Sequence, residues 1–219
     1  MKYVTPIKVV VFLLCLIPMV RLGWNAYSNN LGANPIEVIT RSTGTWTLVF
    51  LLIVLSVSPL RRISGAHWLI RLRRMLGLFA FFHACLHFVT YIWLDQFFEF
   101  MEMMRDVIKR PFITVGFISF VLLIPLALTS TSGMIRRLGG RRWQQLHRLV
   151  YLTAIGGVIH YLWLVKADQR EPLIYGSVLT VLLGYRIVVT WGGKWPFQIA
   201  RKSKSARSTS VGASREKRN

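Results

Sequence analysis

Long apolar runs constrain this chain more than any other feature, because a run of about 20 apolar residues is suited to the core of a bilayer. The run at residues 143–164 is one of them, and it carries two histidines, His147 and His160. Ionisable groups inside a membrane are costly and usually mark a functional site. At about 1.5 Å per residue, the two imidazoles lie roughly 20 Å apart along the helix axis, one near each face of the bilayer. This spacing suits the transfer of electrons across a membrane.

Composition places the chain among integral membrane proteins. Of its 219 residues, 53% are hydrophobic and 13% are aromatic, which is more apolar surface than a soluble domain can bury. The formal net charge of +20 would suit nucleic acid, but the basic residues cluster between apolar runs and in the C-terminal tail, where they act as topology signals. We therefore predict no nucleic-acid partner. Cys15 and Cys85 lie inside apolar runs and indicate buried thiols rather than a disulfide framework.

The order of apolar runs and basic clusters predicts an all-α membrane protein, a bundle of six transmembrane helices. Arginine clusters follow the second and fourth runs, and the tail is basic, so the positive-inside rule places both termini in the cytoplasm. We expect a transmembrane domain at residues 1–199 and a disordered basic cytoplasmic tail at residues 200–219. The loops at residues 28–42 and 95–110 then face outward, and the second of them holds four of the chain's eight acidic residues. The six runs begin near residues 7, 45, 72, 111, 143 and 172.

A pair of histidines on the third and fifth runs is the main candidate site. With this topology the two runs are parallel, and His87 and His160 each lie sixteen or seventeen residues in, about 25 Å from the cytoplasmic end. Two imidazoles at one depth on facing helices are a ligand set for a b-type haem. We predict that this pair holds haem. The alternative is that the histidines are polar contacts between helices.

His147 lies about one turn inside the cytoplasmic face, where the third run offers Arg74 and Met75 instead of a histidine. A second haem at this depth would need Met75, His67 from the preceding loop or an external ligand. Arg74 and Arg148 are candidates for binding haem propionates or the phosphate of a flavin, although topology alone also explains such arginines. The residues therefore leave the haem count open at one or two.

Two further expectations concern the geometry of these helices. The thirteen residues between His147 and His160 rotate an ideal helix through about 220°, so the two share a face only if the helix is distorted. The expected place for such a distortion is Gly156-Gly157. His83 lies one turn before His87 on the same face and is an alternative ligand or a hydrogen-bonding neighbour.

Three segments of the chain resemble a known family of membrane cytochromes. They are TGTWTLVFLLIVLSVSPLRR, RRMLGLFAFFHACLHFVTYIWLD and RRLGGRRWQQLHRLVYLTAIGGVIHYLW, and the resemblance covers about residues 43–191. The family is MsrQ, also called YedZ, the haem-binding membrane subunit of a periplasmic protein-methionine-sulfoxide reductase system, within the ferric reductase-like transmembrane superfamily. The resemblance implies a b-type cytochrome in a bacterial inner membrane, with haem ligands at His87, His147 and His160.

The same resemblance implies partners for electron transfer. The acceptor is a periplasmic molybdopterin-dependent methionine sulfoxide reductase subunit that repairs oxidised proteins, so the chain itself has no expected catalytic residues. The donor is the quinone pool or a cytosolic flavin reductase, and a bound flavin mononucleotide (FMN) is a further expectation. Larger relatives carry a nucleotide-binding domain after the helices, whereas only a basic tail follows residue 195 here, so we expect the donor to be a separate molecule.

Two other function classes remain open. One is a haem-containing, quinol-oxidising subunit of another dehydrogenase, which would differ in its partner. The other is a small transporter or assembly factor without haem, in which the histidines relay protons or pack. The halves of the chain show no repeated hydropathy pattern of the kind found in many transporters. Absorption by haem would separate the second class from the others.

Overall fold

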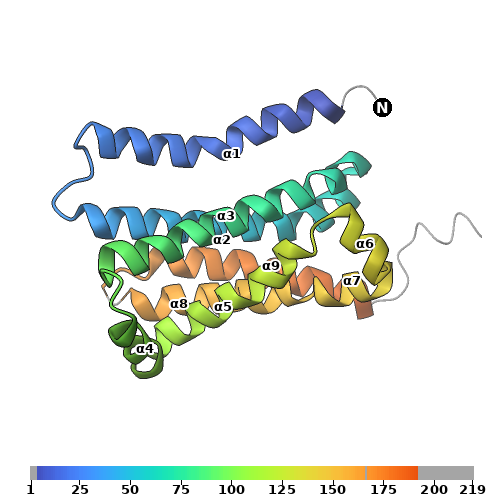
Figure 1. Ribbon diagram of the computed structural model, residues 1–219. Helices are drawn as coiled ribbons and strands as arrows, with labels where there is room; N and C mark the ends of the chain where they lie inside the picture. The colour runs from blue at the N-terminus through green and yellow to red at the C-terminus, as the bar shows by residue number, and fades with distance from the viewer. Residues whose placement is uncertain (1–3, 166, 192–219) are drawn as a thin grey trace, which may run out of the picture. The chain divides into compact units, whose positions relative to one another are not determined.

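The structure, a computed structural model, describes residues 4–165 and 167–191, and all regular structure within them is helical. Five helical segments are long and apolar enough to cross a bilayer, as expected of a multi-pass membrane protein (Figure 1). The predicted tail at residues 200–219 lies outside the described residues. The five are α1 (Val4–Tyr27), α2 (Pro35–Ser64), α3 (Arg73–Thr90) with its π-helical continuation η2 (Tyr91–Asp95), α5 (Pro111–Leu128) and α9 (Arg170–Trp191).

The helices of the first compact unit, Met1–Thr180, pack as two antiparallel pairs. α2 lies along α3, and α5 lies along α8 (Leu149–Leu164). The pairs meet where α3 touches α5 and where α2 touches α8, and α1 lies at the edge against α2 and α3 (Figure 1). Ala80 and Ala154 are fully buried, because small side chains let membrane helices approach closely. α3 and α8 run in the same direction (Figure 1).

α2 begins well before the predicted start of the second span at residue 45. Asn34 caps the helix by accepting a hydrogen bond from the Glu37 N–H, and Pro35 occupies the first turn, where its missing N–H is not needed. The predicted loop at residues 28–42 is therefore too long. The added turns of α2 contain Thr40 and Gly44, which matter for the site.

The predicted fifth span is interrupted near its start. α7 (Gly140–Leu146) stops at His147, and α8 starts at Leu149. The expected distortion at Gly156-Gly157 is wrong, because α8 is continuous there. A Cβ atom at Gly156 would collide with the Ser119 side chain of α5, so this glycine serves close packing. α8 itself has 16 residues, about 24 Å of helix.

The predicted loop at residues 95–110 contains the amphipathic helix α4 (Phe100–Lys109). Its apolar face is open, with Met101, Met104 and Ile108 at least 56% exposed. An amphipathic helix with such a face suits the boundary between lipid and water. Two short helices also lie outside the spans: η1 (His67–Arg71) and α6 (Ser132–Leu138).

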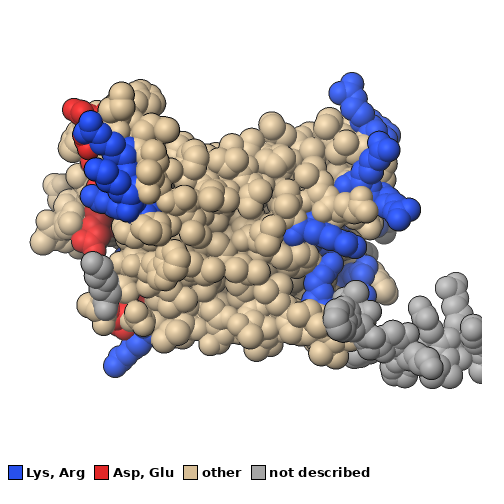
Figure 2. Space-filling model, turned by 90° about the horizontal axis from the view of Figure 1, so that it is seen from below, with Lys and Arg blue, Asp and Glu red and all other residues tan. Residues whose placement is uncertain are grey.

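Charged residues gather at the two ends of the first unit, with an apolar band between them (Figure 2). One end, called the acidic end below, holds the described acids mixed with basic residues, and the other, the basic end, holds only lysine and arginine among its described charged residues. All four ion pairs among the described residues lie at the acidic end, which α4 also occupies. The described residues of the basic end include no acid. The acidic end holds Glu37, Asp95, Glu99, Glu102, Asp106, Asp168 and Glu171, and the basic end holds Lys8, Arg61, Arg62, Arg71, Arg73, Arg74, Arg136, Arg137, Arg141, Arg142 and Arg148.

Candidate histidine site

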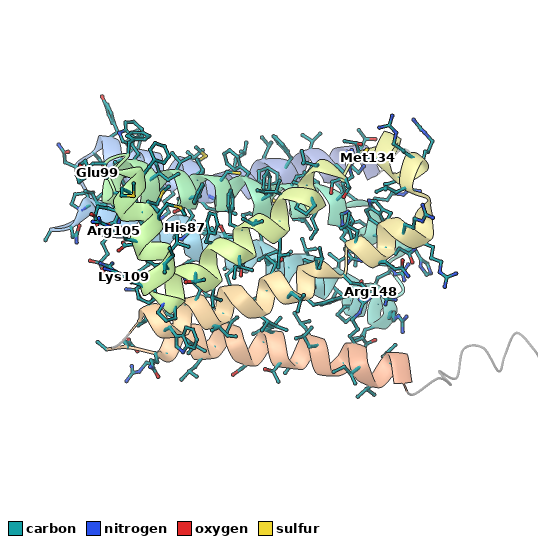
Figure 3. All side chains as sticks on the ribbon, turned by 60° about the horizontal axis from the view of Figure 1, so that its bottom comes forward. His87, Glu99, Arg105, Lys109, Met134 and Arg148 are labelled. Carbon is teal, nitrogen blue, oxygen red and sulfur yellow. The ribbon has the colours of Figure 1, made fainter. Side chains whose placement is uncertain are left out.

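The two histidines expected at one depth face each other between the helix pairs. His87 extends from α3 and His160 from α8, and their ring centroids are 6.2 Å apart with planes inclined by 73°. Figure 3 shows His87 near the α4 end of the bundle. The site is therefore built from both antiparallel pairs and lies nearer the acidic end than the basic end.

Each imidazole is oriented by a main-chain carbonyl of the helix paired with its own. His87 Nδ1 lies 2.9 Å from the carbonyl oxygen of Thr40, and His160 Nδ1 lies 2.6 Å from that of Phe112. A carbonyl oxygen can only accept, so both Nδ1 atoms donate and carry the ring proton. The lone pair on Nε2 is then available to a metal in both rings, which is the usual arrangement of metal-binding histidines.

A glycine one turn after each carbonyl makes room for the imidazole. Gly44 follows Thr40 by four residues, and a Cβ there would lie 3.0 Å from His87 Cε1. Gly116 stands in the same relation to Phe112, and its Cβ would lie 2.7 Å from His160 Nδ1. Helical Cα–Cβ bonds tilt toward the N-terminus, so a side chain at position i+4 would cover the carbonyl of residue i. Each imidazole therefore binds at a seat, by which we mean a main-chain carbonyl together with the glycine that exposes it: Thr40 and Gly44 for His87, and Phe112 and Gly116 for His160.

The geometry of the pair fits a haem held by two imidazoles. Metal–nitrogen bonds of about 2 Å place the ligand nitrogens about 4 Å apart and the ring centroids about 6 Å apart, close to the observed 6.2 Å. Two buried hydroxyls close in sequence to these groups, Thr40 Oγ1 and Tyr91 Oη, have no hydrogen-bond partner among the described residues. Such atoms are costly unless a ligand satisfies them, so they also suit a polar group bound beside the pair.

His147 has a different environment at the break between α7 and α8. Its ring stacks on Trp143 with centroids 3.9 Å apart, and its Nε2 lies 3.0 Å from Thr129 Oγ1. Thr129 Oγ1 also lies 2.6 Å from the Pro125 carbonyl, to which it donates, so it accepts from His147 Nε2–H. The Nε2 nitrogen of His147 is therefore engaged by Thr129, unlike the Nε2 atoms of His87 and His160.

Known proteins match most of this chain. Residues 40–158 match the family described as "Ferric reductase like transmembrane component". The "Protein-methionine-sulfoxide reductase heme-binding subunit MsrQ" of Herminiimonas arsenicoxydans is 58% identical over 189 residues, which are 85% of this chain and 87% of the relative. The protein of the same name from Azospira oryzae is 55% identical over 198 residues, 89% of this chain and 85% of the relative. The chain belongs to the MsrQ family.

The segment matched within the ferric reductase-like family contains most of the site seen in this MsrQ-family chain. It begins at Thr40, whose carbonyl accepts from His87, and it ends two residues before His160. The match therefore spans α3, α5 and α8 as far as residue 158, together with the part of α2 that carries the Gly44 seat.

The predicted arginines lie away from the histidine pair. Arg74 Nη1 donates to Ser132 Oγ at 3.1 Å, and it lies about 20 Å along α3 from His87. Arg148 is exposed at the start of α8 and lies at the end opposite His87 (Figure 3). In this MsrQ-family chain both residues can serve only a group at the basic end. Met75 lines a groove beside α1, and His67 is exposed on η1.

His83 is buried on the side of α3 that packs against aromatic side chains. Its Nδ1 donates to the Phe79 carbonyl of its own helix at 3.0 Å, and its ring lies 5.0 Å from that of Phe50. Its Nε2 is buried without a hydrogen-bond partner among the described residues. It lines a small cavity shared with α1 and α2.

A polar cluster ties α2, α8 and α9 together beside the pair. The Tyr161 hydroxyl donates to Glu171 Oε2 at 2.6 Å, and Arg41 Nη2 lies 3.5 Å from the same oxygen. Tyr161 follows His160 on α8, and Arg41 follows Thr40 on α2. The cluster therefore joins the helix that carries the seat of His87 to the helix that carries His160. The sequence analysis did not single out this cluster, the two carbonyls, Gly44 or Gly116. Only the glycines, each inside an apolar helix, give a signal in the sequence.

Proposed function

We propose that the chain is the haem-binding, electron-transfer membrane subunit of a protein-methionine-sulfoxide reductase system. The observation that carries this proposal is the facing pair of His87 and His160, each with Nδ1–H bonded to a carbonyl. The names of the relatives, which describe heme-binding subunits, support the same function.

One haem b would be held between Nε2 of His87 and Nε2 of His160. Bound there, haem b supplies one-electron oxidation and reduction. The chain fixes both imidazoles in the Nδ1-protonated tautomer and limits their rotation through the two glycine seats. The unpartnered hydroxyls of Thr40 and Tyr91 provide donors for the polar edge of the group. We propose His147 as a residue of the donor side, since its Nε2 would have to leave Thr129 to bind metal.

The charge distribution supports six spans with both termini in the cytoplasm of a bacterium and the chain in its inner membrane. The basic end then faces inward, and reducing equivalents enter there from quinol or reduced flavin. Arg148 is the remaining candidate for binding the phosphate of FMN, since Arg74 lines the groove beside α1. The acidic end faces the periplasm, where a molybdopterin-dependent methionine sulfoxide reductase receives the electrons.

The test is a reduced-minus-oxidised spectrum of the purified full chain with haem quantified per polypeptide. We expect a low-spin b-type signal with a ratio near one. His87→Ala and His160→Ala should each lose it, whereas His67→Ala, an exposed control, should keep it. Retention by His147→Ala would support a single site at the pair, and a loss would assign His147 to a haem. A wild-type chain that binds no haem when haem is supplied during expression would refute the proposal.

A further inference from the structure

A groove of about 530 Å³ lies between α1 and α3 at the basic end. Its apolar wall includes side chains that are partly open to the membrane: Phe12 is 45% exposed, Leu78 is 40% exposed and Phe82 is 38% exposed. Phe12 meets Phe79 edge to face with ring centroids 5.2 Å apart, which joins α1 to α3 across the groove. The groove is therefore an apolar surface next to lipid rather than an enclosed cavity.

Three cations stand at the same groove, namely Lys8, Arg71 and Arg74. No acidic residue lines it, and none of the three forms an ion pair with a described acid. Arg74 donates to Ser132 through Nη1 only, and a guanidinium has further donors to offer. The three cations are exposed, and clustered basic residues at a membrane surface attract anionic head groups, so the groove is complementary to a negatively charged partner.

The arrangement matches an amphiphile with an anionic head. The cations lie toward the start of α1 and α3, and the apolar side chains continue for about two turns along α3 toward the middle of the bundle. A quinol carries no charge that would need three cations, and a flavin phosphate has no acyl chain to cover Phe12 and Leu78. Basic pockets between transmembrane helices on the cytoplasmic side suit anionic lipid head groups.

We propose that this groove binds an anionic phospholipid, with its phosphate between Lys8, Arg71 and Arg74 and an acyl chain along Phe12, Leu78 and Phe82. The lipid would fill the space between α1 and α3 and hold α1 against the bundle. This inference does not depend on haem, because the groove and the histidine pair lie toward opposite ends of α3.

The test counts lipids bound to the full-length chain in detergent by native mass spectrometry. The probes are phosphatidylglycerol and phosphatidylcholine with identical acyl chains. We expect the wild type to prefer phosphatidylglycerol. A basic residue near the membrane surface contributes about a fivefold change in binding, so Lys8→Gln with Arg71→Gln should weaken phosphatidylglycerol binding about 30-fold. Arg62→Gln, an exposed arginine of the same end outside the groove, is the matched control.

A substitution in the apolar part of the groove gives a second, independent variant. Leu78→Trp should reduce binding of phosphatidylglycerol by occupying the acyl position, and thermal unfolding of all variants reports whether they fold. Equal binding of the two lipids by the wild type, or the same loss with Arg62→Gln as with the double variant, would overturn the proposal. So would a flavin or quinone that co-purifies with the wild type and is lost in the double variant while lipid binding is unchanged.

Discussion

Substituting Gly116 by alanine tests the seat of His160 directly. The added Cβ would lie 2.7 Å from Nδ1, 2.9 Å from Cε1 and 3.1 Å from Cγ of the His160 ring. All three atoms belong to one rigid imidazole that is already bonded to the Phe112 carbonyl at 2.6 Å. To reach ordinary van der Waals contact the ring has to move by about 0.7 Å. That displacement is away from the carbonyl that orients it.

The free-energy contributions of three effects decide whether Gly116→Ala stabilises or destabilises the protein. Replacing a helical glycine by alanine stabilises a helix by up to about 1 kcal/mol. Overpacking costs about 1–3 kcal/mol, and weakening the Nδ1–H bond costs about 1 kcal/mol more. We expect Gly116→Ala to lower the free energy of unfolding by about 1–3 kcal/mol. Displaced hydrogen-bond partners of metal ligands reduce metal affinity about 10–100-fold, and we expect a loss of haem affinity in that range.

The assay is a haemin titration of purified apoprotein, with thermal unfolding of the same apoprotein as a readout that does not involve haem. Gly44→Ala should show a smaller effect, because its Cβ would lie 3.0 Å from the nearest ring atom. Gly77→Ala on α3 is the matched control, since a Cβ there meets nothing within 4 Å. If Gly116→Ala binds haem as tightly as Gly77→Ala and unfolds at the same temperature, then the absence of a side chain at Gly116 is not what allows His160 to bind the Phe112 carbonyl.

Three further outcomes follow from the contacts. Thr129→Val leaves the His147 Nε2–H without its acceptor, so the apoprotein should lose about 1–3 kcal/mol in thermal unfolding while the haem ratio stays unchanged. Glu171→Gln removes an exposed ion pair and should change the free energy of unfolding by less than about 1 kcal/mol. In intact spheroplasts, a membrane-impermeant maleimide should label Glu102→Cys quickly and Ile108→Cys slowly, because the two positions lie on the polar and apolar faces of α4.

The opposite result in each of these three experiments would change the assignment of one group. A change of haem ratio in Thr129→Val would make His147 a ligand. A loss of several kcal/mol in Glu171→Gln would mean that the cluster at the acidic end is screened from water. Equal labelling of the two cysteines would place both faces of α4 in water, and no labelling of either from outside would invert the proposed topology.

The sequence was sufficient for features that depend only on hydropathy and helical rise. The spans of α3 and α5 and the common depth of His87 and His160 follow from counting residues at a fixed rise, and the structure places the two rings opposite each other, with centroids 6.2 Å apart. The start of α2 was missed because the polar stretch at residues 40–43 resembles a loop, although Thr40 and Thr43 bury their hydroxyls inside the bundle.

Other features depend on tertiary contacts that leave little trace in the sequence. Trp143 stabilises the break at His147, because its Nε1–H donates to the Thr129 carbonyl at 2.9 Å. No local sequence pattern predicts this contact between α7 and the end of α5. The helix α4 mixes acids with apolar residues in a short segment, so a helical face and a polar loop were hard to tell apart. The acceptors for His87 and His160 are main-chain carbonyls, and because every residue has one, no residue type in the sequence reveals which carbonyls are used.

The main-chain seats also determine which substitutions the site can tolerate. The atoms that orient the two imidazoles belong to the backbone, so exchanging the side chain of Phe112 leaves the acceptor for His160 in place. A site supported by aspartates would lose that support through a single codon change. Here the vulnerable positions are the two that must have no side chain at all, and genetic variation that damages cofactor binding should concentrate at Gly44 and Gly116 as well as at the histidines themselves.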